Sequence, residues 1–201
     1  MRKLLFNTLL TCFVISANGQ IINSKLQNQI DKLKQSNVDT FLIYSFYCDG
    51  ESIRLDTCSY NEQEYLFWVK ENSYFIKKFD DCKTYKSILL NSINPFSFYI
   101  KFKDSINKEE IKMPSLITSK NSNKEITSIL SHDCFYKMSF NLKKENISKK
   151  VSQYNLTFKK FDDGNMNRYY HYNQNTKLKA LVNQLTQLIE QLNKEDQFKI
   201  E

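Results

Sequence analysis

Residues 1–19 constrain everything that follows them in the chain. Arg2 and Lys3 give a positively charged start, and the next twelve residues are mostly apolar. Ala17-Asn18-Gly19 then supplies the small residues of a cleavage site. Charge, apolar core and small residues in this order are typical of a secretory signal peptide. We therefore expect a signal peptide that ends at Gly19, and a single exported domain over residues 20–201 that is periplasmic or extracellular.

A second way to process this segment is cleavage before Cys12. Leu9-Leu10-Thr11-Cys12 is an imperfect lipoprotein cleavage box, which would leave the domain lipid-anchored through Cys12. The apolar stretch continues through Phe13-Val14-Ile15, so we favour cleavage after Gly19. Beyond Gly19 no apolar run approaches the roughly 20 residues of a membrane span, which predicts a mature chain without a transmembrane segment.

Cysteine number and spacing predict a covalent framework. Four cysteines remain after cleavage at Gly19, namely Cys48, Cys58, Cys82 and Cys134. An even number in an exported domain predicts two disulfides. Cys58 and Cys82 lie just outside the arms of a predicted hairpin, which favours a Cys58–Cys82 bond and leaves Cys48–Cys134 as the second. The alternative is Cys48–Cys58. Because no CxxC spacing occurs, we predict no metal site.

The composition excludes several classes of function. Gly50 and Gly164 are the only glycines after the signal segment, so neither GxGxxG nor GxxxxGK[ST] phosphate loops can form. The net charge of +7 comes almost entirely from lysine, and Arg54 and Arg168 are the only arginines beyond Arg2. Arginine is the preferred residue for contacts to bases and phosphates. We therefore expect no sequence-specific nucleic-acid binding, and we predict no cofactor.

Two amphipathic helices enclose the rest of the predicted domain. Residues 21–36 carry a narrow apolar stripe, and residues 175–193 carry a continuous one at helical spacing. The second stripe could be a coiled-coil seam for a partner, but it is too short for one, so we expect it to cover a sheet. Ser122 and Glu125 have capping-box spacing, which predicts a short helix over residues 123–131.

Aromatic and β-branched residues between these helices predict an antiparallel meander of seven or eight strands. Asp49-Gly50 and Asp163-Gly164 are hairpin turn signals, and Glu71-Asn72-Ser73 separates the arms of a third hairpin. The predicted strands cover residues 41–48, 52–58, 65–69, 74–79, 96–103, 134–143, 152–161 and 166–172. The fold class is therefore α+β, with an N-terminal helix, the meander, and a C-terminal helix packed on one sheet face.

Two arrangements of residues resemble catalytic sites. His132 and Cys134 are two residues apart and could form a nucleophilic pair, but a cysteine in an exported domain is better explained as half of a disulfide. A glycosidase needs two carboxylates that face each other across a cleft. The acidic pairs of this sequence lie side by side in predicted turns instead. They are Glu62/Glu64, Asp80-Asp81, Glu109-Glu110 and Asp162-Asp163. We assign no catalytic residue.

Tyr169, Tyr170, His171 and Tyr172 form an aromatic cluster that could hold a ligand by ring stacking. A carbohydrate or a single-stranded nucleic acid would suit such a patch. In a strand, Tyr169 and His171 would share one face, and Tyr170 and Tyr172 the other. Packing of tyrosines between neighbouring strands is the alternative explanation, and we favour it.

No stretch of the sequence carries the motif of a known family. We expect a disulfide-stabilised exported domain, of bacterial source, that binds a protein or an extended polymer such as a cell-surface polysaccharide without catalysis. A secreted hydrolase and a carrier of a small molecule or lipid are the alternatives. A deep pocket with converging polar groups would favour the hydrolase, and an exposed aromatic patch on a sheet would favour the binding module.

Overall fold

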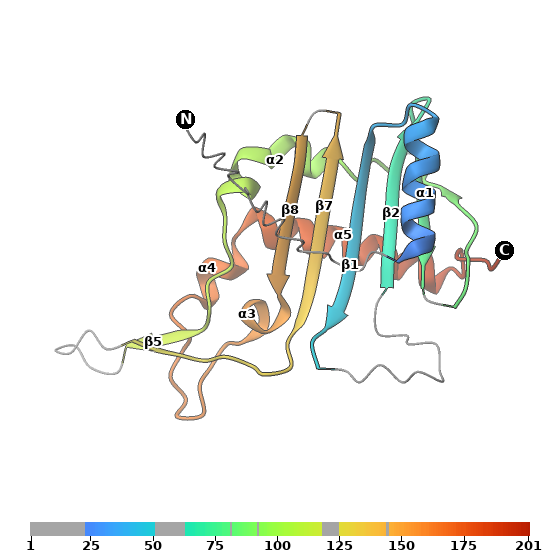
Figure 1. The fold of residues 1–201 in the computed structure, drawn as a ribbon. Coiled ribbons are helices and arrows are strands. Elements are labelled where there is room, and N and C mark those ends of the chain that lie inside the picture. The colour runs from blue at the N-terminus through green and yellow to red at the C-terminus, as the bar shows by residue number, and fades with distance from the viewer. Residues whose placement is uncertain (1–22, 51–62, 81, 92, 118–124, 144) are drawn as a thin grey trace, which may run out of the picture.

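An antiparallel sheet of six strands forms the centre of the computed structural model (Figure 1). Its strand order is β4-β3-β2-β1-β7-β8, so β1 to β4 form a meander and the β7–β8 hairpin pairs beside β1. The strands are β1 (Thr40–Cys48), β2 (Gln63–Lys70), β3 (Ser73–Phe79), β4 (Ile88–Leu89), β7 (Cys134–Leu142) and β8 (Glu145–Ser152). A separate pair consists of β5 (Ser115–Ile117) and β6 (Glu125–Thr127).

Five helices accompany the sheets within the residues that the structure describes, which are 23–50, 63–80, 82–91, 93–117, 125–143 and 145–201. The helices are α1 (Ser24–Gln35), α2 (Ser97–Lys108), α3 (Gln153–Thr157), α4 (Tyr170–Gln174) and α5 (Lys177–Lys194). These elements confirm the α+β class with its N-terminal and C-terminal helices. The predicted signal peptide and the predicted strand at 52–58 lie outside the described residues.

The sheet separates two apolar layers because side chains alternate between its faces. On one face, Leu26, Ile30 and Leu33 of α1 pack against Leu66 and Trp68 of β2. On the other face lie α2 and α5, and Figure 1 shows α5 crossing behind the strands. The result is a three-layer arrangement in which both strand faces carry large apolar residues.

α5 confirms the clearest prediction from the sequence. Its buried side chains all come from the predicted stripe, and they are Leu178, Leu181, Val182, Leu185, Ile189 and Leu192. Thr176 precedes the helix, and its hydroxyl accepts a hydrogen bond from the backbone N–H of Lys179 at 3.1 Å. This N-cap satisfies one of the free donors of the first turn. The stripe packs on the sheet, as expected for a covering helix.

The prediction of a strand over 96–103 was wrong, because these residues begin α2. Phe96, Tyr99 and Ile106 are buried, and their spacing of three and seven residues is helical. The ring of Tyr99 stacks on Phe140 of β7, with ring centroids 3.9 Å apart. The carbonyl oxygen and the side-chain oxygen of Asn94 accept the first backbone N–H groups at this end. Phe96, Phe98 and Phe102 lie an even number of residues apart, so the sequence suggested a strand and concealed the helical spacing.

Two further strands were predicted wrongly, at 152–161 and at 166–172. The strand in the first region is β8, which ends at Ser152, and α3 follows it directly. The hydroxyl of Ser152 accepts from the backbone N–H of Asn155 at 2.9 Å, so a capped turn replaces the continued strand. β8 is an edge strand of the sheet, and because most of its residues are polar, apolar and polar residues do not alternate clearly along it. The second region contains α4 instead of a strand.

The predicted helix over 123–131 is also wrong for the residues described there. Residues 125–127 form β6, which pairs with β5. Instead of serving a capping box, Glu125 accepts a hydrogen bond from the hydroxyl of Ser115 and lies 3.7 Å from the Arg168 guanidinium. Ile129, expected on the buried face of this helix, is 76% exposed.

The turn signals give mixed outcomes. Gly164 has φ +82°, and an antiparallel bridge joins Lys160 to Met166, so the predicted turn is present without the longer strands. The hairpin of β2 and β3 closes through Glu71 and Asn72, both with positive φ. Such a two-residue loop normally contains glycine, which is why its register could not be predicted.

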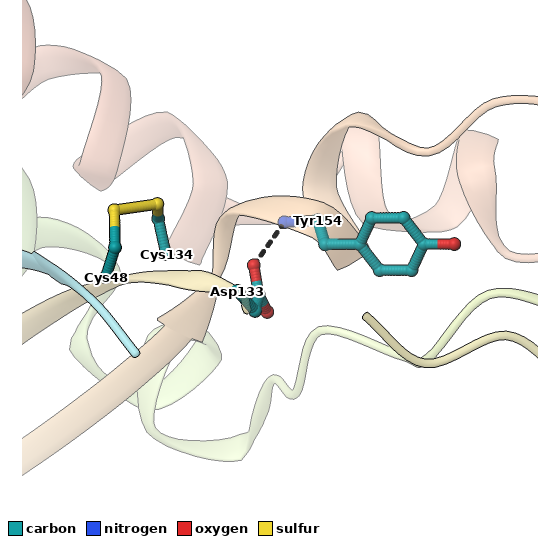
Figure 2. The surroundings of a disulfide bond; sticks show 4 residues. All are labelled: Cys48, Asp133, Cys134 and Tyr154. Atoms are coloured by element: carbon teal, nitrogen blue, oxygen red, sulfur yellow. Dashed lines mark hydrogen bonds between the residues drawn. A yellow bond between two sulfur atoms is a disulfide. The ribbon is translucent and has the colours of Figure 1, made fainter. Parts of the chain in front are cut away.

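A disulfide joins β1 to β7 where the two strands end. Cys48 and Cys134 face each other in the strand register, and their sulfur atoms are bonded (Figure 2). The alternative Cys48–Cys58 bond is therefore wrong. Cys82 is also disulfide-bonded, whereas Cys58, the partner predicted for it, lies outside the described residues. No helix among those that the structure describes is long and apolar enough to cross a membrane.

Candidate functional site

Three tyrosines meet on the α5 side of the sheet because of the strand register. Tyr44 of β1 pairs directly with Tyr65 of β2, and Tyr136 of β7 pairs with Phe46 of β1. The ring centroid of Tyr44 lies 6.5 Å from that of Tyr65 and 6.4 Å from that of Tyr136. These distances are typical of interacting aromatic rings. The strands therefore place a row of phenols beside the C-terminal half of α5.

A hollow of about 300 Å³ opens between these rings and α5. We call it the tyrosine hollow. Its lining combines aromatic faces with amide, hydroxyl and carboxylate groups from β1, β2, β7, α3 and α5. The residues are Tyr44, Phe46, Gln63, Tyr65, Tyr136, Gln153, Thr186, Ile189, Glu190 and Asn193. Such a combination of apolar surface and few polar groups is typical of binding sites.

A second hollow of about 300 Å³ lies toward the N-terminal end of α5. We call it the lysine hollow. It is lined by Tyr136, Gln153, Leu156, Thr157, Tyr170, Gln174, Lys179, Val182 and Asn183. Tyr136 and Gln153 line both hollows, so the two lie next to each other along the helix. Together they form what we call the α5 site.

The phenols of Tyr44, Tyr65 and Tyr136 stay protonated at neutral pH. Burial raises the pKa of Tyr44 well above its usual range, against the opposing effect of a 2.6 Å hydrogen bond with the Thr186 hydroxyl. Burial also raises the pKa of Tyr65 to about 12, and its hydroxyl donates to Gln63 Oε1 at 2.7 Å. Burial likewise raises the pKa of Tyr136. Tyr44 and Tyr65 are 3% and 2% exposed, and their hydroxyls bond to Thr186 and Gln63. Tyr136 is half-buried and is therefore the phenol of this row that a ligand can reach.

Gln153 reaches the α5 site because two side chains start α3 at that point. The carboxylate of Asp133, next to the disulfide, accepts a hydrogen bond from the backbone N–H of Tyr154 at 3.0 Å (Figure 2). Ser152 caps the same turn. A helix N-terminus with both a carboxylate and a hydroxyl acceptor is well satisfied. The disulfide thus lies beside the turn that positions Gln153.

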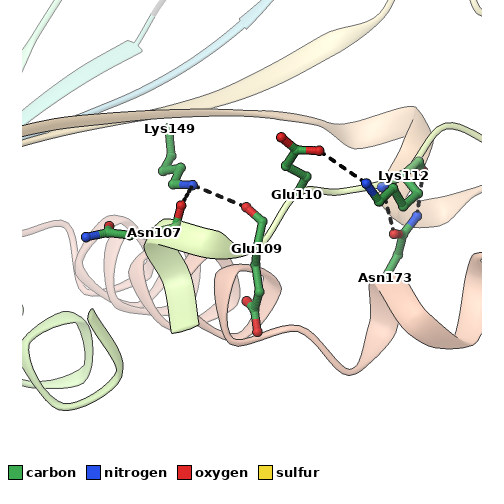
Figure 3. A network of polar contacts seen from close by, with 6 residues as sticks. All are labelled: Asn107, Glu109, Glu110, Lys112, Lys149 and Asn173. Carbon is green, nitrogen blue, oxygen red and sulfur yellow. Dashed lines mark hydrogen bonds and ion pairs between the residues drawn. The ribbon is translucent and has the colours of Figure 1, made fainter. Parts of the chain in front are cut away.

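Asn173 ties α4 to α3 and to the segment that follows α2. Its side-chain oxygen accepts from the backbone N–H of Lys112 at 2.9 Å, and its amide nitrogen donates to the carbonyls of Lys112 and Asn155 at 2.8 and 2.9 Å. Figure 3 shows this side chain beside Lys112. The residue is fully buried, and its amide joins three separate segments. It therefore holds Tyr170 and Gln174 in place through α4.

The N-terminus of α5 is held against the end of α2. Lys149 of β8 donates to the carbonyl oxygens of Asn107 and Glu109 at 2.7 and 3.2 Å, where a cation is favourable at a helix C-terminus (Figure 3). The carboxylate of Glu109 in turn accepts from the backbone N–H of Leu178 at 2.7 Å, in the first turn of α5. This chain of contacts fixes the start of α5, and with it Lys179.

Of the aromatic cluster predicted as a ligand patch, one residue lines the α5 site. Tyr169 precedes α4, whereas Tyr170, His171 and Tyr172 belong to it. Tyr170 lines the lysine hollow, and Lys159 Nζ lies 5.8 Å from its ring centroid. Tyr172 is 45% exposed and lines neither hollow. The rings of Tyr170 and His171 contact each other, with centroids 5.6 Å apart.

The other sequence features do not form a site in the described residues. Cys134 is bonded to Cys48, so the pairing with His132 as a nucleophile is excluded. The ring of His132 packs on Gly50, where a Cβ would lie 1.9 Å from the ring Nδ1. Within the described part of the chain, no group of three or more His, Cys, Asp or Glu side chains could hold a metal ion.

A third hollow, of about 250 Å³, lies on the same sheet face as α1, over the part of β1, β7 and β8 that the helix leaves uncovered. Its lining contains no charged side chain. The residues are Phe41, Ile43, Ser139, Phe140, Asn141, Asn146, Ile147 and Ser148. Because it offers fewer ring faces and no ionic group, the α5 site is the stronger candidate.

Comparison of the chain with protein-family models, curated proteins and solved structures finds no match. The function is therefore argued from the chemistry of the α5 site. The half-buried rings of Phe46, Tyr136 and Tyr170 provide flat apolar faces, and its amides can donate and accept hydrogen bonds. Tyr44, Tyr65 and Tyr136 were missed as site residues, because they share a face only when β7 is known to pair with β1.

Proposed function

We propose that the protein is an exported binding module that holds a segment of polysaccharide along α5. The observation that carries this proposal is the pair of hollows that share Tyr136 and Gln153. Their lining residues on α5 run from Lys179 to Asn193, which corresponds to about 21 Å of helix. A site of this length suits several linked units better than one small ring.

The chemistry of the lining supports a sugar chain as the ligand. A pyranose ring has an apolar face of C–H groups and a rim of hydroxyls. The half-buried rings of Phe46 and Tyr136 match the first. The amides of Gln63, Gln153 and Asn193 each bond to a tyrosine hydroxyl, and because an amide can donate and accept at once, their remaining groups match the second. An extended polypeptide would instead seek a free strand edge or an apolar groove.

The acidic groups of the site favour binding over glycoside hydrolysis. The tyrosine hollow contains one carboxylate, that of Glu190, and the lysine hollow contains none among its lining residues. Hydrolysis by the common glycosidase mechanisms needs an acid and a second carboxylate on opposite sides of the bond. A single carboxylate can still orient a ligand by accepting hydrogen bonds from its hydroxyls.

Export is supported by the covalent framework. The Cys48–Cys134 bond is of the kind that persists in oxidising compartments. The charged, apolar and small-residue order of the first nineteen residues supports the same location. A module of this kind would meet its polysaccharide at or outside the cell surface.

The proposal is tested by measuring affinity for a panel of soluble polysaccharides by affinity electrophoresis and calorimetry. Tyr136→Ala should weaken binding at least tenfold, because this ring borders both hollows. Tyr170→Ala, at the rim, should weaken it less. The matched control is Tyr172→Ala, whose ring lines neither hollow and should leave binding unchanged. Circular dichroism confirms that each variant is folded.

Absence of binding to every polysaccharide tested, or equal binding by wild type and Tyr136→Ala, would contradict the proposal. Binding of an unstructured polypeptide in place of a sugar chain, again lost in Tyr136→Ala, would show that the site is real but that its ligand is a protein.

A further inference from the structure

The two halves of the α5 site differ in charge. Lys179 is the one charged residue among those lining the lysine hollow, whereas Glu190 is the one charged residue lining the tyrosine hollow. The other polar groups at the lysine hollow include the amides of Gln153, Gln174 and Asn183, which can donate hydrogen bonds. The lysine hollow therefore offers positive charge and donors without a competing carboxylate.

The ammonium group of Lys179 has no acidic partner within the described residues. None of the ion pairs there includes it, and burial is the cause that lowers its pKa. A partly buried charge without a counter-ion is unfavourable unless a ligand supplies one. The side chain thus lies at the wall of a hollow with its charge uncompensated by the protein.

The start of α5 brings both positive and negative groups near the lysine hollow. Lys179 is in the first turn of α5, where the partial positive charge of the helix dipole lies. Lys159 adds a second cation beyond the ring of Tyr170. The carboxylate of Glu109 accepts from the N–H of Leu178 and offsets the dipole at this helix end, so the positive charge at the hollow comes from the lysine side chains.

We infer that the lysine hollow binds an anionic group of the polysaccharide, a carboxylate or a sulfate, which forms an ion pair with Lys179. The ligand is then an acidic sugar chain, with its negative group between Tyr170 and α5 and its neutral hydroxyls beside the tyrosines. Glu190 repels a negative group from the other hollow, so the charge also sets the direction in which the chain lies. This inference rests on the proposed function and names its ligand class.

Paired probes that differ only in charge test it. We would titrate the wild-type protein with oligogalacturonate hexamers and their methyl esters, with mannuronate and glucuronate hexamers and their methyl esters, and with sulfated and unsulfated galactan hexamers. At least one acidic hexamer should bind about tenfold more tightly than its neutral partner, as for a charge-assisted contact. The two kinds of pair distinguish carboxylate from sulfate.

Lys179→Gln should remove this preference, so that the acidic hexamer and its neutral partner bind with about equal affinity. Lys194→Gln is the matched control, because it removes an exposed lysine from the other end of α5 and should retain the preference. A preference that persists in Lys179→Gln overturns the inference. Equal binding of acidic and neutral hexamers by wild type also overturns it while the proposed function stands, and no binding of either kind overturns both.

Discussion

At the scale of the residue, the buried phenols of the α5 site make the free energy of unfolding depend on pH in the alkaline range. The pKa of Tyr65 is raised to about 12, mainly by burial, whereas an unfolded tyrosine ionises near pH 10. The unfolded chain therefore loses its proton first. The stabilisation is fully present below pH 10 and is lost as pH rises from about 10 to 12.

The first prediction concerns this loss of stability at high pH. The free energy of unfolding of the wild-type protein should fall as pH rises above about 10, and tyrosinate absorbance should lag behind that of an unfolded chain. Tyr65→Phe should show a shallower fall over the same range. Urea titrations at several pH values, followed by circular dichroism, measure it. A fall of identical slope in Tyr65→Phe would contradict the assignment.

Asp80 gives the opposite dependence at acid pH. Burial alone would raise the pKa of its carboxyl group, but hydrogen bonds from Lys83 N, the Tyr85 hydroxyl and Cys82 N, at 2.5, 2.7 and 3.0 Å, hold it below its usual value. Its stabilising effect is therefore present above about pH 4 and is lost as pH falls through the lowered pKa.

The second prediction concerns Asp80→Asn. This variant should be less stable than wild type at neutral pH, and the difference should shrink at low pH, where the wild-type carboxyl is protonated too. Thermal unfolding monitored between neutral and acid pH measures the difference. Asp104→Asn, at an exposed position, serves as a control and should stay within about 0.5 kcal/mol of wild type. A constant difference at all pH values would argue against this role for the charge.

At the scale of the element, Asn173 connects α4 to α3 and to the segment after α2. The third prediction is that Asn173→Ala lowers the free energy of unfolding by about 3 kcal/mol, because buried backbone groups lose their partners. Urea denaturation measures it. Asn175→Ala, which removes one exposed hydrogen bond to the carbonyl of His171, should cost less than about 1 kcal/mol. Equal effects of the two substitutions would show that the buried amide is not the main connection.

Helices and strands in which the apolar residues follow one clear periodicity were predicted correctly from the sequence. α5 and α1 have a clear helical stripe, and β1 to β3 and β7 are rich in aromatic and β-branched residues. The sequence of α2 fits both the two-residue spacing of a strand and the spacing of a helix. In the helix, Tyr99 stacks on Phe140 of the distant strand β7, a contact that the local sequence does not reveal. α3 and α4 are too short for periodicity, and local caps such as Ser152 define them.

At the scale of the whole molecule, the Cys48–Cys134 bond closes a long stretch of chain, because its cysteines are 86 positions apart in sequence. The fourth prediction is that replacing both by alanine lowers the free energy of unfolding by about 2–5 kcal/mol, as for other native disulfides in exported domains. Denaturant titration of the double variant measures it. Intact mass of the wild type without reductant should show no free thiol at these positions, and free thiols there would contradict the predicted bond.

The site could not be predicted from the sequence because it depends on pairing between strands that are distant in the chain. Tyr44 and Tyr136 are far apart in the chain and become neighbours when β7 joins β1. Tyr170 was the one residue of the predicted patch that lines the site, although α4 holds it instead of a strand. Local patterns can identify ring-bearing segments, but the order of strands decides which rings meet.

The most direct test of the central claim is to map where a bound oligosaccharide touches the protein by two-dimensional NMR. With the tightest-binding hexamer, we expect chemical-shift changes in Tyr44, Tyr65, Tyr136 and the residues of α5 from Lys179 to Asn193. Shifts confined to the third hollow, at Ile43, Ser139 and Ser148, or no shifts at a saturating concentration, would contradict binding at the α5 site.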